Sequence, residues 1–293
     1  MLNYKAQIGK NYYNRLCKDN LEKMNLISFV LLSGGASKRM GRDKGLVKFG
    51  DKPLIMHVLN TINEFLDLLN LESQIPVKVV LHDYLQQDEY LDQVPLLSED
   101  QIIIDEEVWN CVYSDIPQPP QGSMFGVWTA MNALRGKTKN IFVLPCDAPF
   151  VSEAVLSYML EEYFRNDKIL AKNKSRSNKH QRKYTSYIPR WMNGKFEPLF
   201  AIYNIRSINA VLEKKILSKL YSFQITIEEL LEDPLVVGLN EIQYEVDIRE
   251  IPIEEELARY DQKLVNFIDI DSSESLKSVE TLLREKKGLS QEI

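Results

Sequence analysis

The chain has 293 residues, is 44% hydrophobic and carries a formal net charge of −6, so it is long and apolar enough to bury a sizeable core. Its mild acidity argues against a dedicated nucleic-acid-binding protein, and no run approaches the ~18 apolar residues of a membrane span. The three cysteines are widely spaced and form neither a zinc-type pair nor an even disulfide set, which predicts a reducing cytoplasm.

The first chemically informative stretch follows a predicted N-terminal extension, residues 1–26, which has no apolar core of signal-peptide length. An apolar run over residues 27–32 predicts a buried first strand. Behind it, Gly34 and Gly35 let the backbone turn sharply and approach a ligand closely, because neither carries a Cβ. Four cations come next and favour binding of a polyphosphate: Lys38, Arg39, Arg42 and Lys44.

Spacing excludes two well-known phosphate loops here. A P-loop needs a serine or threonine after its lysine, whereas Gly45 follows Lys44. A dinucleotide fingerprint needs a third glycine at a fixed place, and none follows Gly34 and Gly35 there. The string instead resembles the signature G-G-x-S-x-R-M-G-x-D-K of the molybdenum cofactor guanylyltransferase family, part of the wider nucleotidyltransferase superfamily. Eight positions match, although Ser33 replaces the family's usual alanine: Gly34, Gly35, Ser37, Arg39, Met40, Gly41, Asp43 and Lys44.

The next elements predict alternating helices and strands. Apolar residues at helical spacing over residues 55–66 predict a helix, and residues 77–81 predict a strand that ends at His82 and Asp83. Residues 102–104 could form a strand that ends at Asp105, and residues 110–114 could form another that ends at Asp115. A helix is then predicted from Gly122 through residue 134, where two glycines match the family's G-P-L-A-G segment.

Residues 140–147 predict the next strong strand, which resembles the family's apolar strand ending in C-D-x-P. Ligands of an α/β sheet bind at the carboxyl ends of its strands, and Asp147 lies at such an end. Asp147 could instead cap the following helix, but Ser152 is better placed for that role. We therefore predict that Asp147 is a metal ligand. The histidines are scattered, which argues against a histidine-based metal site: His57, His82 and His180.

The second half of the chain has strong charge contrasts. Residues 165–195 are basic, and the tip of this stretch is interpreted as a solvated loop. Residues 172–183 are expected to raise the rate of encounter with an anionic acceptor. Residues 196–204 predict a strand resembling the family's E-P-L-F-x-x-Y, residues 206–220 a helix, and residues 226–262 an acidic surface insertion. Residues 267–273 predict a last strand, followed by a helix over 276–283. Asp269 and Asp271 replace the asparagines of the guanylyltransferase F-x-N-I-N-T segment and match the D-I-D-T version of molybdopterin cytidylyltransferases.

The resemblance implies a Rossmann-like α/β nucleotidyltransferase fold with a mostly parallel sheet and helices on both faces. The implied domain covers residues 27–286, with insertions near 84–121, 170–195 and 226–262. The implied reaction transfers GMP from GTP to the terminal phosphate of molybdopterin and releases pyrophosphate. Arg39 and Lys44 would hold the triphosphate, Asp147 would bind Mg²⁺, and Asp269 or Asp271 would supply a second carboxylate. Molybdoenzymes or cofactor-carrier proteins are further expected partners.

The identity of the base is the open point of the sequence. Nucleotide contacts are expected from Leu32 through Gly35, from Lys44 and from Asp147. Guanine offers two donors on one edge, which a carboxylate reads well; Asp83 and Asp115 are the candidates, with Asp105 as the alternative to Asp115. The nucleotide loop favours GTP, whereas the D-I-D ending favours CTP. The sequence also leaves open a sugar-phosphate nucleotidyltransferase, a regulatory nucleotide-binding protein and, least favoured, an RNA-binding arm formed by the basic loop.

Overall fold

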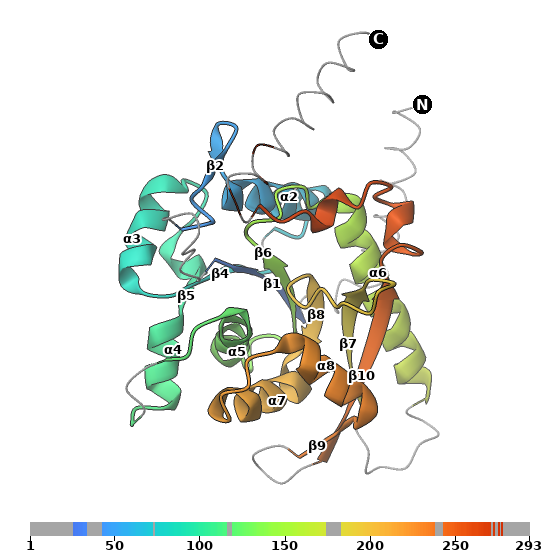
Figure 1. Cartoon of the computed structure of the whole chain (residues 1–293). Coiled ribbons are helices and arrows are strands. Elements are labelled where there is room, and N and C mark those ends of the chain that lie inside the picture. The colour runs from blue at the N-terminus through green and yellow to red at the C-terminus, as the bar shows by residue number, and fades with distance from the viewer. Residues whose placement is uncertain are drawn as a thin grey trace.

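An eight-stranded sheet with the order β5-β4-β1-β6-β8-β7-β10-β9 lies at the centre of the molecule (Figure 1). The computed structural model describes residues 26–33, 43–72, 74–115, 119–173, 183–237, 243–270, 272, 275 and 277. The strands are β1 (Ile27–Leu32), β4 (Val77–Leu81), β5 (Ile102–Ile104), β6 (Asn140–Pro145), β7 (Lys183–Arg190), β8 (Ala201–Asn204), β9 (Leu235–Val237) and β10 (Gln243–Pro252). β8 runs antiparallel to both neighbours and β9 antiparallel to β10, whereas the other pairs are parallel. This mostly parallel sheet confirms the predicted α/β class.

The strand order reverses direction at β1. The chain proceeds from β1 to β4 and β5 on one side, and then returns to place β6 on the other side of β1. In sheets of this kind, ligands bind in the crevice beyond the carboxyl ends of the strands where the order reverses. The register pairs Leu32 of β1 with Pro145 of β6, so the segments that follow these two strands begin side by side.

Helices cover both faces of the sheet, as predicted (Figure 1). Successive side chains of a strand point to opposite faces, so Phe29 and Leu31 of β1 belong to one apolar core while Val30 and Leu32 belong to the other. The first core receives α2 (Leu54–Leu69), α3 (Tyr84–Gln93) and α6 (Glu153–Asn173). The second receives α4 (Asp105–Val112), α5 (Ser123–Ala133), α7 (Ile205–Leu217) and α8 (Phe223–Glu232). Because both faces are covered, all six residues of β1 are buried.

Smaller elements flank the sheet. A two-stranded hairpin joins β2 (Lys48–Phe49) to β3 (Lys52–Pro53), and its apolar residues pack against Ile270 near the C-terminal end of the described chain. Three short 3-10 helices complete the set: η1 (Glu99–Gln101), η2 (Leu257–Arg259) and η3 (Val265–Phe267). Among the described residues, no helix is long and apolar enough to cross a membrane.

The predicted strand over residues 110–114 is wrong. Helix α4 begins at Asp105 and covers most of this segment. Its Trp109 is almost fully buried and packs against Phe125 and Trp128 of α5. This packing decides the conformation, because tertiary contacts override the weak local preference for a strand. The predicted strand over 102–104 and the helix over 206–220 correspond to β5 and α7.

The acidic segment over residues 226–262 is part of the sheet, which corrects its predicted surface location. β10 pairs with β7 over eight residues, from Glu245 opposite Lys183 to Pro252 opposite Arg190. Val246 of β10 packs into one apolar core and Ile251 into the other, so both faces of the strand contribute to the interior. The buried residues of this segment include Val246, Ile251, Ile253 and Leu257. Whether the segment is an insertion relative to other family members stays a prediction.

Several further expectations need correction or lie outside the described chain. The strand predicted over 196–204 begins only at Ala201, because Glu197 to Phe200 form a hydrogen-bonded turn. The segment predicted as a strand over 267–273 is a 3-10 turn followed by extended chain that joins no ladder in its described part. The basic stretch over 165–195 contains the end of α6 and all of β7. Its residues 174–182, the extension over 1–25 and the predicted helix over 276–283, apart from Lys277, lie outside the described residues.

Candidate active site

Lys44 and Asp147 form an ion pair at the point where the strand order reverses. Lys44 Nζ donates a hydrogen bond to Asp147 Oδ2 over 2.8 Å, and the two side chains are 30% and 16% exposed. Asp147 comes just after β6, and the Cys146 amide donates to the Leu32 carbonyl at the end of β1. The Val155 amide donates to Ser152 Oγ, so a serine caps α6 as predicted. Asp147 is therefore available for another role.

Helix α3 holds both described ends of the glycine-rich segment. Asp43 accepts hydrogen bonds from the Gly45 amide at 2.9 Å, from the Tyr90 hydroxyl and from Gln86 Nε2. Gln86 Nε2 also donates to the Ser33 carbonyl over 2.9 Å. Burial raises the pKa of Asp43, although these three hydrogen bonds oppose that effect. Asp43 thus anchors the chain just before Lys44, a structural role that the signature alone did not identify.

The residues between these anchors lie outside the described chain. They include Gly34, Gly35 and Arg39, whose predicted contacts with the nucleotide stay predictions. Leu32 ends β1 and Ser33 follows it, so both lie at the carboxyl edge of the sheet where the prediction puts the nucleotide.

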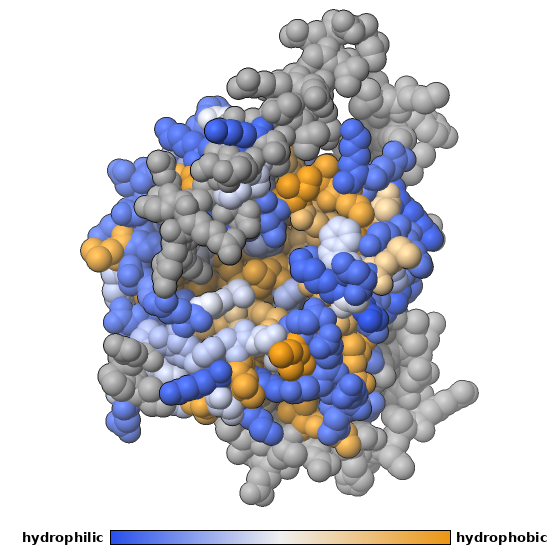
Figure 2. Space-filling view, viewed as in Figure 1, coloured by the Kyte–Doolittle hydropathy of each residue, from blue (hydrophilic) through white to orange (hydrophobic). Residues whose placement is uncertain are grey.

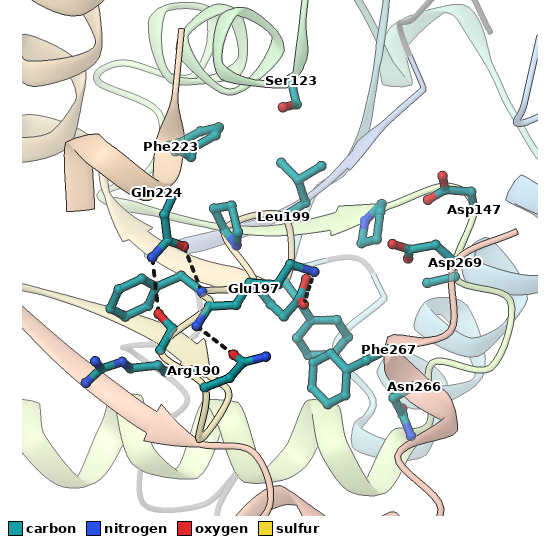
Figure 3. Close-up of a pocket in the computed structure, with 18 of the residues that line it drawn as sticks. Ser123, Asp147, Arg190, Glu197, Leu199, Phe223, Gln224, Asn266, Phe267 and Asp269 are labelled. Carbon is teal, nitrogen blue, oxygen red and sulfur yellow. Dashed lines mark hydrogen bonds and ion pairs between the residues drawn. The ribbon is translucent and has the colours of Figure 1, made fainter. Parts of the chain in front are cut away.

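Asp269 comes from the C-terminal segment and lies beside Asp147 at one end of a cavity (Figure 3). The Ile270 amide donates to the Asp147 carbonyl over 3.0 Å, which ties the two segments together. Asp269 is exposed to the cavity, yet the surrounding protein limits its solvation. Burial raises the pKa of Asp269 to about 7, the charges of Asp147 and Glu197 raise it as well, and two lysines oppose the rise.

The paired carboxylates fit the donor set of a magnesium site. Mg²⁺ is usually bound by one or two carboxylates, with substrate phosphates and water as the other ligands. A cation between Asp147 and Asp269 would also relieve their mutual repulsion. Within the described residues, no group of three or more histidine, cysteine, aspartate or glutamate side chains forms a metal site. Asp271, the other predicted ligand, lies outside the described residues.

The cavity has a volume of about 850 Å³ and extends from this carboxylate pair towards α8. Figure 3 shows Asp147 and Asp269 at one end, Phe223 and Gln224 at the other, and Glu197 between them. Aromatic and charged side chains share its walls, and Figure 2 shows apolar surface inside the hollow with hydrophilic surface around it. This volume is in the range of cavities that enclose small-molecule ligands.

The three carboxylates predicted to read the base lie outside the lining of that cavity. Asp83 accepts from the Gln86 amide over 2.8 Å and caps α3. Asp105 is buried at the end of β5, where its Oδ2 lies 3.9 Å from His82 Nδ1. Asp115 is exposed in a turn after α4, where Ser114 Oγ donates to its carboxylate over 3.4 Å. The buried strand end is therefore occupied by Asp105, whereas Asp115 follows a helix.

Sequence reasoning also missed the residues that shape the cavity wall opposite Lys44. Glu197 accepts hydrogen bonds from Lys195 Nζ and from Trp191 Nε1, and Gln224 bonds to the same segment from α8. The E-P-L-F string contains Glu197 and is the one signal that could have identified this carboxylate.

A family model for the MobA-like NTP transferase domain matches residues 29–224 of this chain. The chain belongs to the MobA-like NTP transferase family. It is therefore a nucleotidyltransferase, and its Lys44–Asp147 pair lies within the matched region. The family signature observed in the sequence is thus confirmed as a true family relationship.

Individual relatives of this MobA-like protein cover nearly its whole length. The probable molybdenum cofactor guanylyltransferase of Natranaerobius thermophilus is 25% identical over 257 residues, which are 88% of this chain and 96% of that protein. Its counterpart from Methanosarcina mazei is 23% identical over 281 residues, 94% and 100% of the two chains. The crystal structure of the Archaeoglobus fulgidus molybdopterin-guanine dinucleotide biosynthesis protein A superposes with a TM-score of 0.57 at 22% identity, over 88% and 99% of the chains. This last similarity supports the fold.

Proposed function

We propose that this nucleotidyltransferase transfers GMP from GTP to the terminal phosphate of molybdopterin and releases pyrophosphate. The observation that carries the proposal is the Lys44–Asp147 ion pair, with Asp269 beside it, at the carboxyl edge of β1 and β6 and at one end of a large cavity. The names of the relatives that align over most of the chain support the choice of donor and acceptor.

The reaction requires two anionic phosphates to meet, so charge neutralisation and alignment matter more than a nucleophilic side chain. Lys44 would leave its contact with Asp147 and hold the phosphates of the nucleotide, together with Arg39 from the glycine-rich segment. Asp147 and Asp269 would hold Mg²⁺, which supplies further neutralisation of phosphate charge when bound. An oxygen of the acceptor phosphate attacks the α-phosphorus, the bond to the bridging oxygen breaks, and pyrophosphate carries away the electron pair.

Asp105 is the stronger structural candidate for reading guanine. Asp105 directly follows β5 and is almost fully buried. In the sheet, β5 lies on the side of β1 that is away from the cavity. A buried polar edge left unpaired discriminates between ligands by as much as about 10⁴-fold. The exposed position of Asp115 gives a weaker basis for such discrimination. Transfer of CMP is the second candidate, favoured by Asp269 and by Asp271 in the D-I-D ending.

Competition between the two nucleotides tests the proposal. The protein is incubated with molybdopterin, Mg²⁺ and equal concentrations of GTP and CTP, and the product is identified by mass spectrometry while pyrophosphate is measured. We expect a guanylylated product, a weaker preference in Asp105→Asn, and little change in the exposed control Asp115→Asn. A mainly cytidylylated product would overturn the choice of GTP. A change in Asp115→Asn alone would return the base contact to Asp115.

A further inference from the structure

The cavity wall opposite Lys44 is a tight turn between β7 and β8 that presents a lysine. The Gly194 amide donates to the Trp191 carbonyl over 2.9 Å, and the Trp191 amide donates to the Lys195 carbonyl over 2.8 Å. Gly194 has a φ of +89°, which a side chain would strain. The Lys195 amide is held by Asn193 Oδ1 at 2.9 Å. The position of Lys195 is thus fixed by its backbone.

A carboxylate then fixes the direction of the Lys195 side chain. Glu197 Oε1 accepts from Lys195 Nζ at 2.9 Å and from Trp191 Nε1 at 2.6 Å. Glu197 is 19% exposed whereas Lys195 is 64% exposed, so the carboxylate is part of the wall and the ammonium reaches into the open space. The Trp191 ring packs edge-on against Phe267, two residues before Asp269, with ring centroids 5.6 Å apart. This contact links the turn to the segment that carries the second carboxylate.

Helix α8 holds the same turn from its other side. Gln224 Oε1 accepts from the Phe196 amide over 3.0 Å, and Gln224 Nε2 donates to the Gly194 carbonyl over 3.1 Å. Figure 3 shows Gln224 reaching from its helix to this segment. The turn is therefore supported by its own hydrogen bonds, by Glu197 and by α8, which suits a site that must hold a charge in one place.

The charges of the cavity include two lysine–carboxylate pairs in addition to Asp269. Lys44 pairs with Asp147 on one side, and Lys195 pairs with Glu197 on the other. Both lysines line the same cavity as Asp269. A transfer between two phosphates needs a cation for each, and a phosphate monoester carries a charge of −1.5 to −2 near neutral pH. Only one of the two lysines belongs to the nucleotide signature.

We propose that Lys195 binds the phosphate monoester of the acceptor, opposite Lys44, and that Glu197 and Trp191 position it. This proposal rests on the proposed nucleotidyl transfer. The phosphate competes with Glu197 for the ammonium, and its larger negative charge favours the exchange. Beyond Lys195 the cavity is lined by the rings of Phe196, Tyr221 and Phe223. They suit an acceptor whose phosphate is attached to a flat ring system.

Binding of inorganic phosphate tests the site without assuming the identity of the acceptor. With a non-hydrolysable GTP analogue at saturation and Mg²⁺ present, phosphate affinity is measured by titration calorimetry. We expect Lys195→Gln to weaken it about tenfold, the lower end for a hydrogen bond to a charged group because this lysine is partly solvated. Lys195→Arg should retain most of the affinity. The matched control is Lys139→Gln, an exposed lysine just before β6, at the strand's opposite end from Asp147.

Trp191→Phe separates positioning from folding, because it keeps a ring against Phe267 but removes the N–H that holds Glu197. We expect weaker phosphate binding with an unchanged melting temperature, and in turnover a raised KM for molybdopterin with an unchanged KM for GTP. Phosphate affinity in Lys195→Gln equal to that of the wild type would overturn the assignment. Failure of the wild type to act on molybdopterin, with the phosphate result intact, would instead reject the proposed acceptor and leave the anion site standing.

Discussion

Replacing Lys44 by methionine removes the cation at the centre of the proposed reaction while keeping the length of the side chain. Two unit charges about 4 Å apart interact by about 4 kcal/mol at an effective dielectric constant of about 20. That energy corresponds to about three powers of ten in rate. The side chain is 30% exposed, so solvent screening reduces the effect. We therefore expect Lys44→Met to lower kcat/KM for the nucleotide by at least ~100-fold.

The assay is continuous detection of pyrophosphate with the acceptor saturating, accompanied by thermal unfolding of each variant. Asp147→Asn should give a loss of at least ~100-fold as well, because it removes a proposed metal ligand and the partner of Lys44. The two side chains are in contact, so the losses should not multiply in the double variant. Lys139→Gln, at the opposite edge of the sheet, should retain wild-type turnover.

A catalytic role of Lys44 would be refuted if folded Lys44→Met kept more than about a tenth of the wild-type kcat/KM. Independent, multiplying losses in the double variant would contradict a shared role of Lys44 and Asp147 in one phosphate site. A loss accompanied by a collapse of the melting temperature would point to the ion pair as a structural feature, since removal of one partner leaves the other charge partly buried.

Two further predictions concern the supports of the nucleotide side. Gly45→Ala should lower the stability by about 1–3 kcal/mol in denaturant unfolding, because a Cβ would overlap the hydroxyls of Tyr90 and Ser33; an unchanged midpoint would contradict this packing. The Asp105 carboxylate raises the pKa of His82 above its usual 6.5, which outweighs the opposing effect of burial. A group with a raised native pKa stabilises the fold fully below its unfolded pKa and loses that contribution as pH rises through the native value. Between about pH 6 and about pH 8.5 the melting temperature of the wild type should thus fall, whereas that of His82→Asn should not. Parallel profiles of the two proteins would exclude a contribution of His82 to stability.

The sequence was sufficient to predict that Lys44 and Asp147 lie near strand ends, because those positions depend on local signals. Apolar runs predicted β1 and β6, and parallel strands bring their carboxyl ends to one edge of a sheet. Lys44 and Asp147, which are far apart in the sequence, could therefore be expected to meet there. The structure brings them within 2.8 Å of each other as an ion pair.

Long-range pairing explains what the sequence could not predict. β10 carries many acidic residues and resembles a solvated segment until β7 is seen beside it. The burial of Val246 and Ile251 depends on that pairing. Similarly, Glu197 shows no special chemistry in the string E-P-L-F. Its role is visible only when Trp191 and Lys195 are brought to the same oxygen, and no periodicity encodes a contact of that kind.

The C-terminal segment contributes a carboxylate to the candidate site, whose other residues lie in the matched family domain. That match ends at residue 224, yet Asp269 lies beyond it and faces Asp147. Two hydrogen bonds join the segment to the chain around β6 and α6: the Ile270 amide donates to the Asp147 carbonyl, and Asn266 Oδ1 accepts from the Ser152 amide at the start of α6. Asn266 is itself fixed by Asp261, which accepts from its backbone and side-chain nitrogens. The loop after β6 and the C-terminal segment are thus joined as one unit, so the spacing of the two carboxylates is set by hydrogen bonds that cross from the family domain to the chain beyond it.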